Sequence, residues 1–209
     1  MSPLALAARV LADHPWLDGA WAGSTGALLL LSRSGQAQFH REGRQSLLHA
    51  LQSQLATHDL TVPSHWRLLD APPPATDRAT IERLLATPRP RQVTPIAEQE
   101  NAGRWRLDLV LPSDLVLFDD HFRTAPVLPG VVQVAWALAL AAPRLGTSNH
   151  CREMEALKFQ RLLRPGDALE LDLHYEAEPG TTLGKLHFAY RLAGQHCSSG
   201  RLRVTLAHG

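Results

Sequence analysis

Cysteine is scarce in this chain, and neither sign of charge is in excess. Only Cys151 and Cys197 occur among 209 residues, and they form no CxxC pair. Two thiols are too few for a disulfide framework, so we expect buried, unreactive thiols in a reducing cytoplasm. Lys and Arg total 21 against 20 Asp and Glu, and no basic run stands out. This balance argues against nucleic-acid binding.

Long apolar runs and common catalytic motifs are also missing. The N-terminus lacks the order of a signal peptide, and the apolar stretch 131–142 contains Gln133 and stops at Pro143. A membrane span needs about 20 apolar residues, so we expect no membrane association. No HExxH, GxSxG, P-loop or GxGxxG pattern occurs, and the histidines lack the spacing of metal ligands. The sequence therefore predicts a cytoplasmic protein without a metal site.

A change of composition divides the chain into two parts. Residues 86–103 are polar, contain several prolines and have no hydrophobic period, which is typical of a linker. We therefore expect an α+β protein with a small α+β domain over 1–88, a linker over 89–103 and a second domain over 104–209.

The first part predicts a mixture of short helices and strands. The expected helices cover residues 4–11, 46–55 and 79–85, and the expected strands cover 27–31, 36–40 and 65–69. Leucines at the spacing of one helix face support the helices, and short apolar runs support the strands. The strand at 36–40 is expected to pair with its predecessor across Ser34 and Gly35.

The second part has the period of a half-buried antiparallel sheet. Apolar and polar residues alternate in four runs, which start near Trp105, Leu169, Leu186 and Leu202. The helix expected over 131–142 is apolar nearly all round, which indicates that other structure encloses it. A curled antiparallel sheet around a buried central helix satisfies both patterns. Its free edge strand favours dimerisation.

The residues before this helix form a chemically suggestive constellation. His121 lies nine positions before Gly130, in a loop that Pro126 and Pro129 make stiff. Gly130 allows a ligand to approach the backbone, and the free amides of the first helical turn favour developing negative charge. A loop histidine alone is more often structural or solvated, but this spacing favours an acid–base residue beside a thioester carbonyl.

Here the chain resembles a known family. The run from His121-Phe122 through Pro126 to Pro129-Gly130-Val131 is similar to the G-H-F-P-x-x-P-x-x-P-G-V signature of 3-hydroxyacyl-carrier-protein dehydratases of the FabA/FabZ type, and most similar to their ApeI-like branch, associated with aryl polyene pigments. Residues 152–167 resemble the family's central strand and R-P-G-D turn, and 197–201 resemble the branch's last strand. The resemblance covers about 104–207 and implies the hot-dog fold.

The resemblance also implies a reaction and its residues. In that family the histidine removes the α-proton of a 3-hydroxyacyl thioester, an acid fourteen positions later protonates the leaving hydroxyl, and the glycine amide polarises the carbonyl. Carried over, His121 is the base and Gly130 the oxyanion donor. The expected substrate contacts are Phe122, Pro129, Val131, Gln133 and Trp136. The product is a trans-2-enoyl thioester in fatty-acid-like, aryl polyene or polyketide biosynthesis.

The implied partners are an acyl carrier protein and a second hot-dog chain, in a homodimer or a heterodimer. No cofactor is implied beyond the carrier's phosphopantetheine. The position of the acid, however, is occupied by Ala135, which cannot donate a proton, and such help is worth about 10²–10⁴-fold. A partner could supply the acid, or Asp119, Asp120 or a water could replace it. The third interpretation is a non-catalytic acyl-binding or scaffolding subunit, and a thioesterase is disfavoured for lack of a suitable carboxylate.

The first part has a weaker resemblance to the mobile C-terminal subdomain of acyl-adenylate-forming ligases. It rests on residues 14–18, the helix expected around 47–55, and residues 62–67 and 70–72. The lysine that ends that subdomain's P-x-x-x-x-G-K turn aligns with Arg78, which is not an equivalent point contact. The resemblance implies a vestige now used for docking, and a purely structural role is the alternative.

Overall fold

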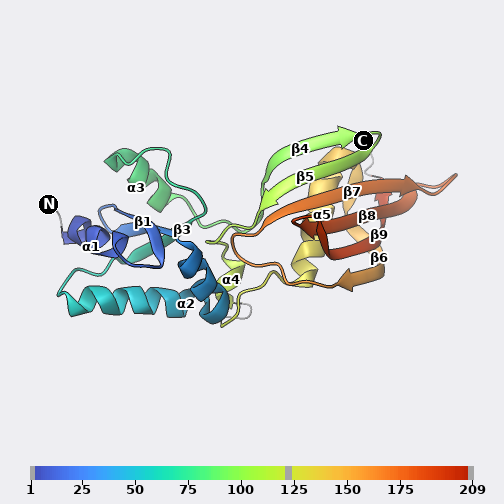
Figure 1. The fold of residues 1–209 in the computed structure, drawn as a ribbon. Coiled ribbons are helices and arrows are strands. Elements are labelled where there is room, and N and C mark those ends of the chain that lie inside the picture. Colours follow the sequence, from blue (N-terminus) through green and yellow to red (C-terminus); the bar gives the residue numbers. More distant parts are fainter. Residues whose placement is uncertain (1–2, 121–123, 207–209) are drawn as a thin grey trace. The chain divides into compact units, whose positions relative to one another are not determined.

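The computed structural model describes residues 3–120 and 124–206, and it has two compact units (Figure 1). The N-terminal unit comprises 1–91 and 112–127, and the C-terminal unit comprises 92–111 and 128–209. The segment 112–127 was expected within the second domain, yet it belongs to the N-terminal unit. Residues 112–120, which lead into the predicted motif, therefore pack with the N-terminal unit.

The N-terminal unit is built on a three-stranded sheet. Its elements are α1 (Pro3–Ala12), β1 (Leu17–Ala22), β2 (Gly26–Leu31), α2 (Arg33–Thr57), β3 (His65–Leu69), α3 (Arg78–Ala86) and the short α4 (Leu117–Asp120). The central strand β2 pairs antiparallel with β1 and parallel with β3. The helices expected over 4–11, 46–55 and 79–85 and the strands over 27–31 and 65–69 are confirmed.

The strand expected over 36–40 is wrong, because these residues lie in α2. Ser32 caps the helix by accepting a hydrogen bond from the Gly35 amide, so the presumed hairpin turn is a helix start. The helix is broken at Gly43, whose φ of 80° lies in the left-handed region. The antiparallel partner of β2 is β1, whose glycine and weak alternation gave no strand signal.

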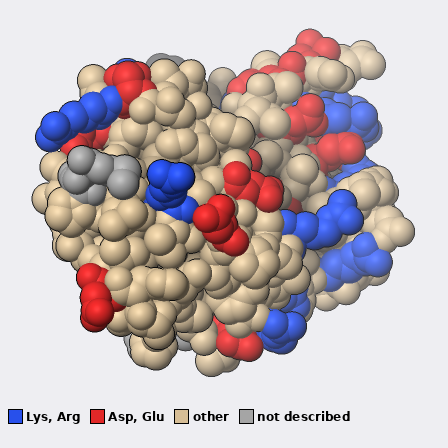
Figure 2. Space-filling view, turned by 60° about the vertical axis from the view of Figure 1, so that its left-hand side comes forward, with Lys and Arg blue, Asp and Glu red and all other residues tan. Residues whose placement is uncertain are grey.

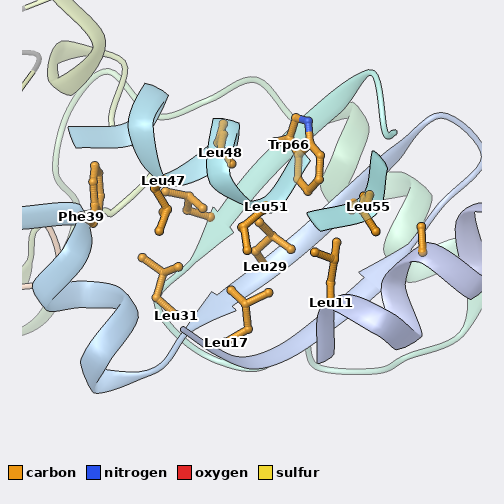
Figure 3. Packing of buried hydrophobic residues seen from close by; sticks show 13 residues of the cluster. Leu11, Leu17, Leu29, Leu31, Phe39, Leu47, Leu48, Leu51, Leu55 and Trp66 are labelled. Carbon is orange, nitrogen blue, oxygen red and sulfur yellow. The ribbon is translucent and has the colours of Figure 1, made fainter. Parts of the chain in front are cut away.

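The core of the N-terminal unit forms between β2 and the second half of α2 (Figure 3). Leu47, Leu51 and Leu55 recur at helical spacing and are fully buried, and Leu29 faces them from the sheet. Trp66 of β3 packs into the same cluster. The leucine spacing that predicted this helix thus corresponds to its buried face.

The C-terminal unit is a six-stranded antiparallel sheet with one long helix. The elements are β4 (Pro95–Asn101), β5 (Arg104–Val110), α5 (Gly130–Leu145), β6 (Thr147–Phe159), β7 (Ala168–Ala177), β8 (Leu183–Leu192) and β9 (Gln195–Leu206). The strand order is β4-β5-β7-β8-β9-β6. Alternate residues of β7 and β8 are buried, and α5 lies along the sheet (Figure 1). The predicted α+β class and hot-dog arrangement are confirmed.

Two expectations about the sheet need correction. Residues 95–101 are not a linker but the edge strand β4, which is exposed at six of its seven residues. An edge strand that covers no core needs no hydrophobic period, and this explains the misleading composition. The strand within residues 152–167, expected to be central, is β6, and it forms the opposite edge in this chain.

The charges show no large field of one sign on the face in view: Figure 2 shows Lys, Arg, Asp and Glu interspersed. This agrees with the formal net charge of +1. Within residues 3–120 and 124–206, no helix is long and apolar enough to cross a membrane.

Candidate functional site

The N-terminus of α5 has unpaired backbone donors. The N-cap residue Pro129 makes no side-chain capping bond, and Pro129 accepts from the amides of Val132 and Gln133. Among the residues that the structure describes, no acceptor meets the amides of Gly130 and Val131. Two free N–H groups at the positive end of a 16-residue helix favour a negatively charged or strongly polarised oxygen.

Gly130 lies directly against an aromatic ring. A Cβ at this position would lie 2.7 Å from Cζ of Phe159, at the end of β6. The ring of Phe159 thus packs closely on the glycine backbone, and a larger residue would displace it. The close approach of a ligand to Gly130, expected from the sequence, stays a prediction.

A buried network of neutral hydrogen bonds fixes the start of α5. Gln133 is 3% exposed, and its side-chain amide donates to the Leu128 carbonyl at 3.0 Å. Its Oε1 accepts from Ser198 Oγ at 2.5 Å, and its backbone carbonyl accepts from the Tyr190 hydroxyl at 3.0 Å. Burial raises the pKa of Tyr190 and keeps this hydroxyl a donor. Gln133 therefore positions the helix, and its expected contact with substrate stays a prediction.

One side of α5 is exposed, so the helix is not enclosed all round. Val131 is 71% exposed, and Ala135 and Ala139 follow on the same side at intervals of four residues. Trp136, an expected substrate contact, is buried on the other side of the helix. The sequence of α5 is apolar nearly all round, and this predicted burial on every side. The structure shows instead that one apolar side is exposed. Ala135, at the position where the family resemblance predicts an acid, lies on the open side.

The segment before the motif is held by buried charges in the N-terminal unit. The side chain of Asp114 is 3% exposed, and its carboxylate contacts Arg44 at 3.0 Å, Arg89 at 3.2 Å, and Arg67. Arg89 also forms a two-pronged contact with Asp119, in which Nη2 donates to Oδ1 at 3.1 Å. We call these five residues the Asp114 cluster. Such a cluster is stable only when every charge keeps its partners.

Backbone groups of the same segment are bonded to the N-terminal unit. The Ser113 amide donates to Asp70 Oδ1 at 2.9 Å, and the Val116 amide donates to the Pro90 carbonyl at 3.0 Å. The guanidinium of Arg89 donates to the Asp114 carbonyl at 3.0 Å. Main-chain and side-chain bonds together anchor the backbone from Ser113 to Asp119.

Two of the three arginines of this cluster, Arg44 and Arg89, differ in electrostatic environment. Burial lowers the pKa of Arg44, and attraction to Asp114 offsets this only in part. Burial also acts on Arg89, but its hydrogen bonds to Asp119 and its attraction to Asp114 outweigh it, so the pKa of Arg89 is raised. Arg89 is thus the arginine that interacts most strongly with both Asp114 and Asp119.

The structure brings only some of the predicted site residues together. His121 and Phe122 lie outside the described residues, so their roles stay predictions. Pro129 and Gly130 begin α5, next to the network of Gln133. Asp119, one of the possible replacement acids, is engaged with Arg89.

Sequence reasoning missed the Asp114 cluster altogether. Its arginines come from α2, β3 and the loop after α3, and no spacing in the sequence relates them. Among the described residues, no group of His, Cys, Asp and Glu could hold a metal ion.

Comparisons with known proteins find matches to the C-terminal unit. The family model described as "ApeI-like: ApeI dehydratase" matches residues 97–201, half of the chain. The dehydratase heterocomplex ApeI:P from Xenorhabdus doucetiae is 30% identical, with a TM-score of 0.48 over 55% of this chain and 98% of that one. An uncharacterized protein from Erwinia carotovora subsp. atroseptica is 25% identical, with a TM-score of 0.44 over 55% and 97% of the two chains.

More distant structures match as well. The R-hydratase PhaJ1 from Pseudomonas aeruginosa is 16% identical, with a TM-score of 0.39 over 55% of this chain and 86% of that one. No curated protein matches significantly.

Proposed function

The chain belongs to the ApeI-like dehydratase family, and on this premise we propose that it takes part in the dehydration of 3-hydroxyacyl thioesters on an acyl carrier protein. The product is a trans-2-enoyl thioester in a fatty-acid-like, aryl polyene or polyketide pathway. The observation that carries the proposal is the family match over the motif, together with the two amides at the start of α5 that find no acceptor among the described residues.

The proposed reaction assigns a role to each end of the motif. His121 removes the α-proton, and the amides of Gly130 and Val131 stabilise the negative charge that develops on the thioester oxygen. The C3–O bond then breaks, and the departing hydroxyl takes a proton to leave as water. Phe122, Pro129 and Trp136 are the proposed contacts of the acyl chain. No cofactor is needed beyond the carrier's phosphopantetheine.

The proton for the departing hydroxyl has no donor at position 135. We propose that a second hot-dog chain supplies it, because Ala135 lies on the open apolar side of α5. The edge strand β6 adds further exposed apolar groups, with Met154 at 51% and Phe159 at 49% exposure. Unpaired edge strands are ready to add a partner strand. A homodimer would bring two histidines and no acid at these positions, so a heterodimer with an acid-bearing chain is favoured.

The second candidate function is a non-catalytic subunit that binds acyl chains or stabilises an active dehydratase. Ala135 is the observation in its favour, because alanine cannot transfer a proton. Asp119 is a weaker replacement acid, since Arg89 already engages both of its oxygens.

The test is a dehydration assay with a 3-hydroxyacyl-carrier-protein substrate. The purified chain is assayed alone and with each hot-dog protein encoded near it. We expect product only from a mixture, and we expect His121→Ala in this chain to abolish it. Activity that survives His121→Ala in the mixture would support the non-catalytic function instead.

A gain-of-function variant sharpens this test. Ala135→Glu should give the chain activity on its own, by about 10²–10⁴-fold over the unmodified chain. Ala139→Glu is the matched control, because it places the same acid one turn further along the exposed side of α5. Equal activity of both variants would contradict the assignment of position 135.

A further inference from the structure

Arg89 makes an unusual set of contacts within the Asp114 cluster. It contacts the Asp114 carboxylate, the carbonyls of Asp114 and Leu115, and both carboxylate oxygens of Asp119. Arg67 contacts Asp114 but not Asp119, and its other bonds go to the carbonyls of α3 and the loop after it. Arg44 also contacts both aspartates, at 3.0 Å from Asp114 and 4.0 Å from Asp119, but of the three arginines in the cluster Arg89 is the one that donates hydrogen bonds to both.

The second of these aspartates precedes the motif closely. Asp119 is two residues before His121, and two residues of chain span at most about 7 Å. Asp119 is therefore the described residue nearest to the motif whose carboxylate is held by hydrogen bonds. A planar guanidinium that grips both oxygens of a carboxylate also fixes its orientation, which the single point charge of a lysine does not.

We propose that Arg89 is a positioning residue for the dehydration, which holds the backbone leading into His121 through its paired contacts with Asp114 and Asp119. The proposal rests on the proposed function. It gives the N-terminal unit a task that its resemblance to a ligase subdomain does not suggest, namely to hold the segment that leads into the proposed base. Positioning is a large part of catalysis, because a misplacement of about 1 Å can cost about 100-fold in rate.

The experiment compares Arg89→Gln with Arg67→Gln in the full chain. Both substitutions remove one arginine from Asp114, but only Arg89→Gln also removes the hydrogen bonds to Asp119, which then keeps only the longer contact of 4.0 Å with Arg44. Hydrogen–deuterium exchange of peptides that cover 112–127 reports the backbone directly. The dehydration assay, with the partner that gives activity, reports kcat and KM separately.

We expect Arg89→Gln to speed exchange in 112–127 by about 10-fold or more and to lower kcat by about 10-fold to 100-fold, with KM within about twofold. Arg67→Gln should leave kcat within about twofold, although it removes a buried contact. Arg89→Lys should recover part of the lost kcat. Asp119→Asn combined with Arg89→Gln should be no slower than Arg89→Gln alone, because both changes remove one contact.

Other results would overturn the proposal. An equal loss of kcat in Arg89→Gln and Arg67→Gln would mean that both residues only stabilise the fold. An unchanged kcat in Arg89→Gln would exclude a role in positioning. If the unmodified chain is inactive with every partner, the proposed function fails. The exchange data then decide separately whether Arg89 anchors the segment, and equal exchange in both variants would refute the anchor as well.

Discussion

The two units secure the two sides of the motif with different chemistry. The C-terminal unit fixes the start of α5 through the neutral groups of Gln133, Ser198 and Tyr190. The N-terminal unit fixes the preceding segment through the charges of the Asp114 cluster, of which Asp114 is the most deeply buried. Neutral groups lose only hydrogen bonds when a partner is removed, whereas buried charges are left uncompensated. The segment before the motif should therefore be the more sensitive of the two to a single substitution.

The largest effect is expected from Asp114→Asn. Three arginines would lose the carboxylate that they share, so the free energy of unfolding of the N-terminal unit should fall by about 3–5 kcal/mol. Urea denaturation combined with hydrogen exchange in 33–57 measures this loss. Asp172→Asn is the control, because it weakens partly exposed ion pairs with Arg106 and Arg191 and should cost about 1 kcal/mol or less. Equal losses in the two variants would remove the contrast between buried and exposed charge.

A smaller loss is expected from Gln133→Ala. The substitution leaves Ser198 Oγ and the Leu128 carbonyl without their partner and opens a small cavity, so we expect a loss of about 2–3 kcal/mol. Thermal and urea unfolding of the C-terminal unit measure it. Gln99→Ala, at an exposed position of β4, should stay within about 0.5 kcal/mol. If Gln133→Ala lost more stability than Asp114→Asn, the start of α5 would be more sensitive to substitution than the segment before the motif, and the proposed order would be wrong.

The smallest effect is expected in the reactivity of Cys197. This thiol is fully buried, burial raises its pKa, and only the thiolate reacts, so a thiol reagent at pH 8 should label the partly exposed Cys151 first. Asp114→Asn should leave Cys197 protected, and Gln133→Ala should speed its labelling. Faster labelling in Asp114→Asn would mean that loss of the charged cluster loosens the C-terminal unit too.

Periodic patterns in the sequence predicted most of the fold. The alternating runs of β5, β7, β8 and β9 and the leucine spacing of α2 each correspond to a buried face in the structure. The errors arose where a segment covers no core, as in β4, or where a local cap overrides a turn signal, as at Ser32. Neither an exposed edge strand nor a capping hydrogen bond produces a periodic pattern of apolar residues in the sequence.

The candidate site was predicted from the sequence only in part. The motif from His121 to Gly130 could be noticed because its residues lie along one short stretch of chain, and its catalytic role stays a prediction. The expected acid position at Ala135 follows from the same spacing and also stays a prediction. The role of Gln133 in holding α5 could not, because its partners Ser198 and Tyr190 are 65 and 57 residues away.

By itself, the sequence determined the hot-dog half of the fold, the family and the position of the motif, because all three depend on local spacing and on the alternation of side chains along strands. Only the tertiary structure decided that the segment before the motif belongs to the N-terminal unit and that Arg89 ties it there. It also decided which side of α5 stays open. These features depend on contacts between distant parts of the chain, and charge pairs such as Arg89 with Asp119 form wherever the fold brings them together.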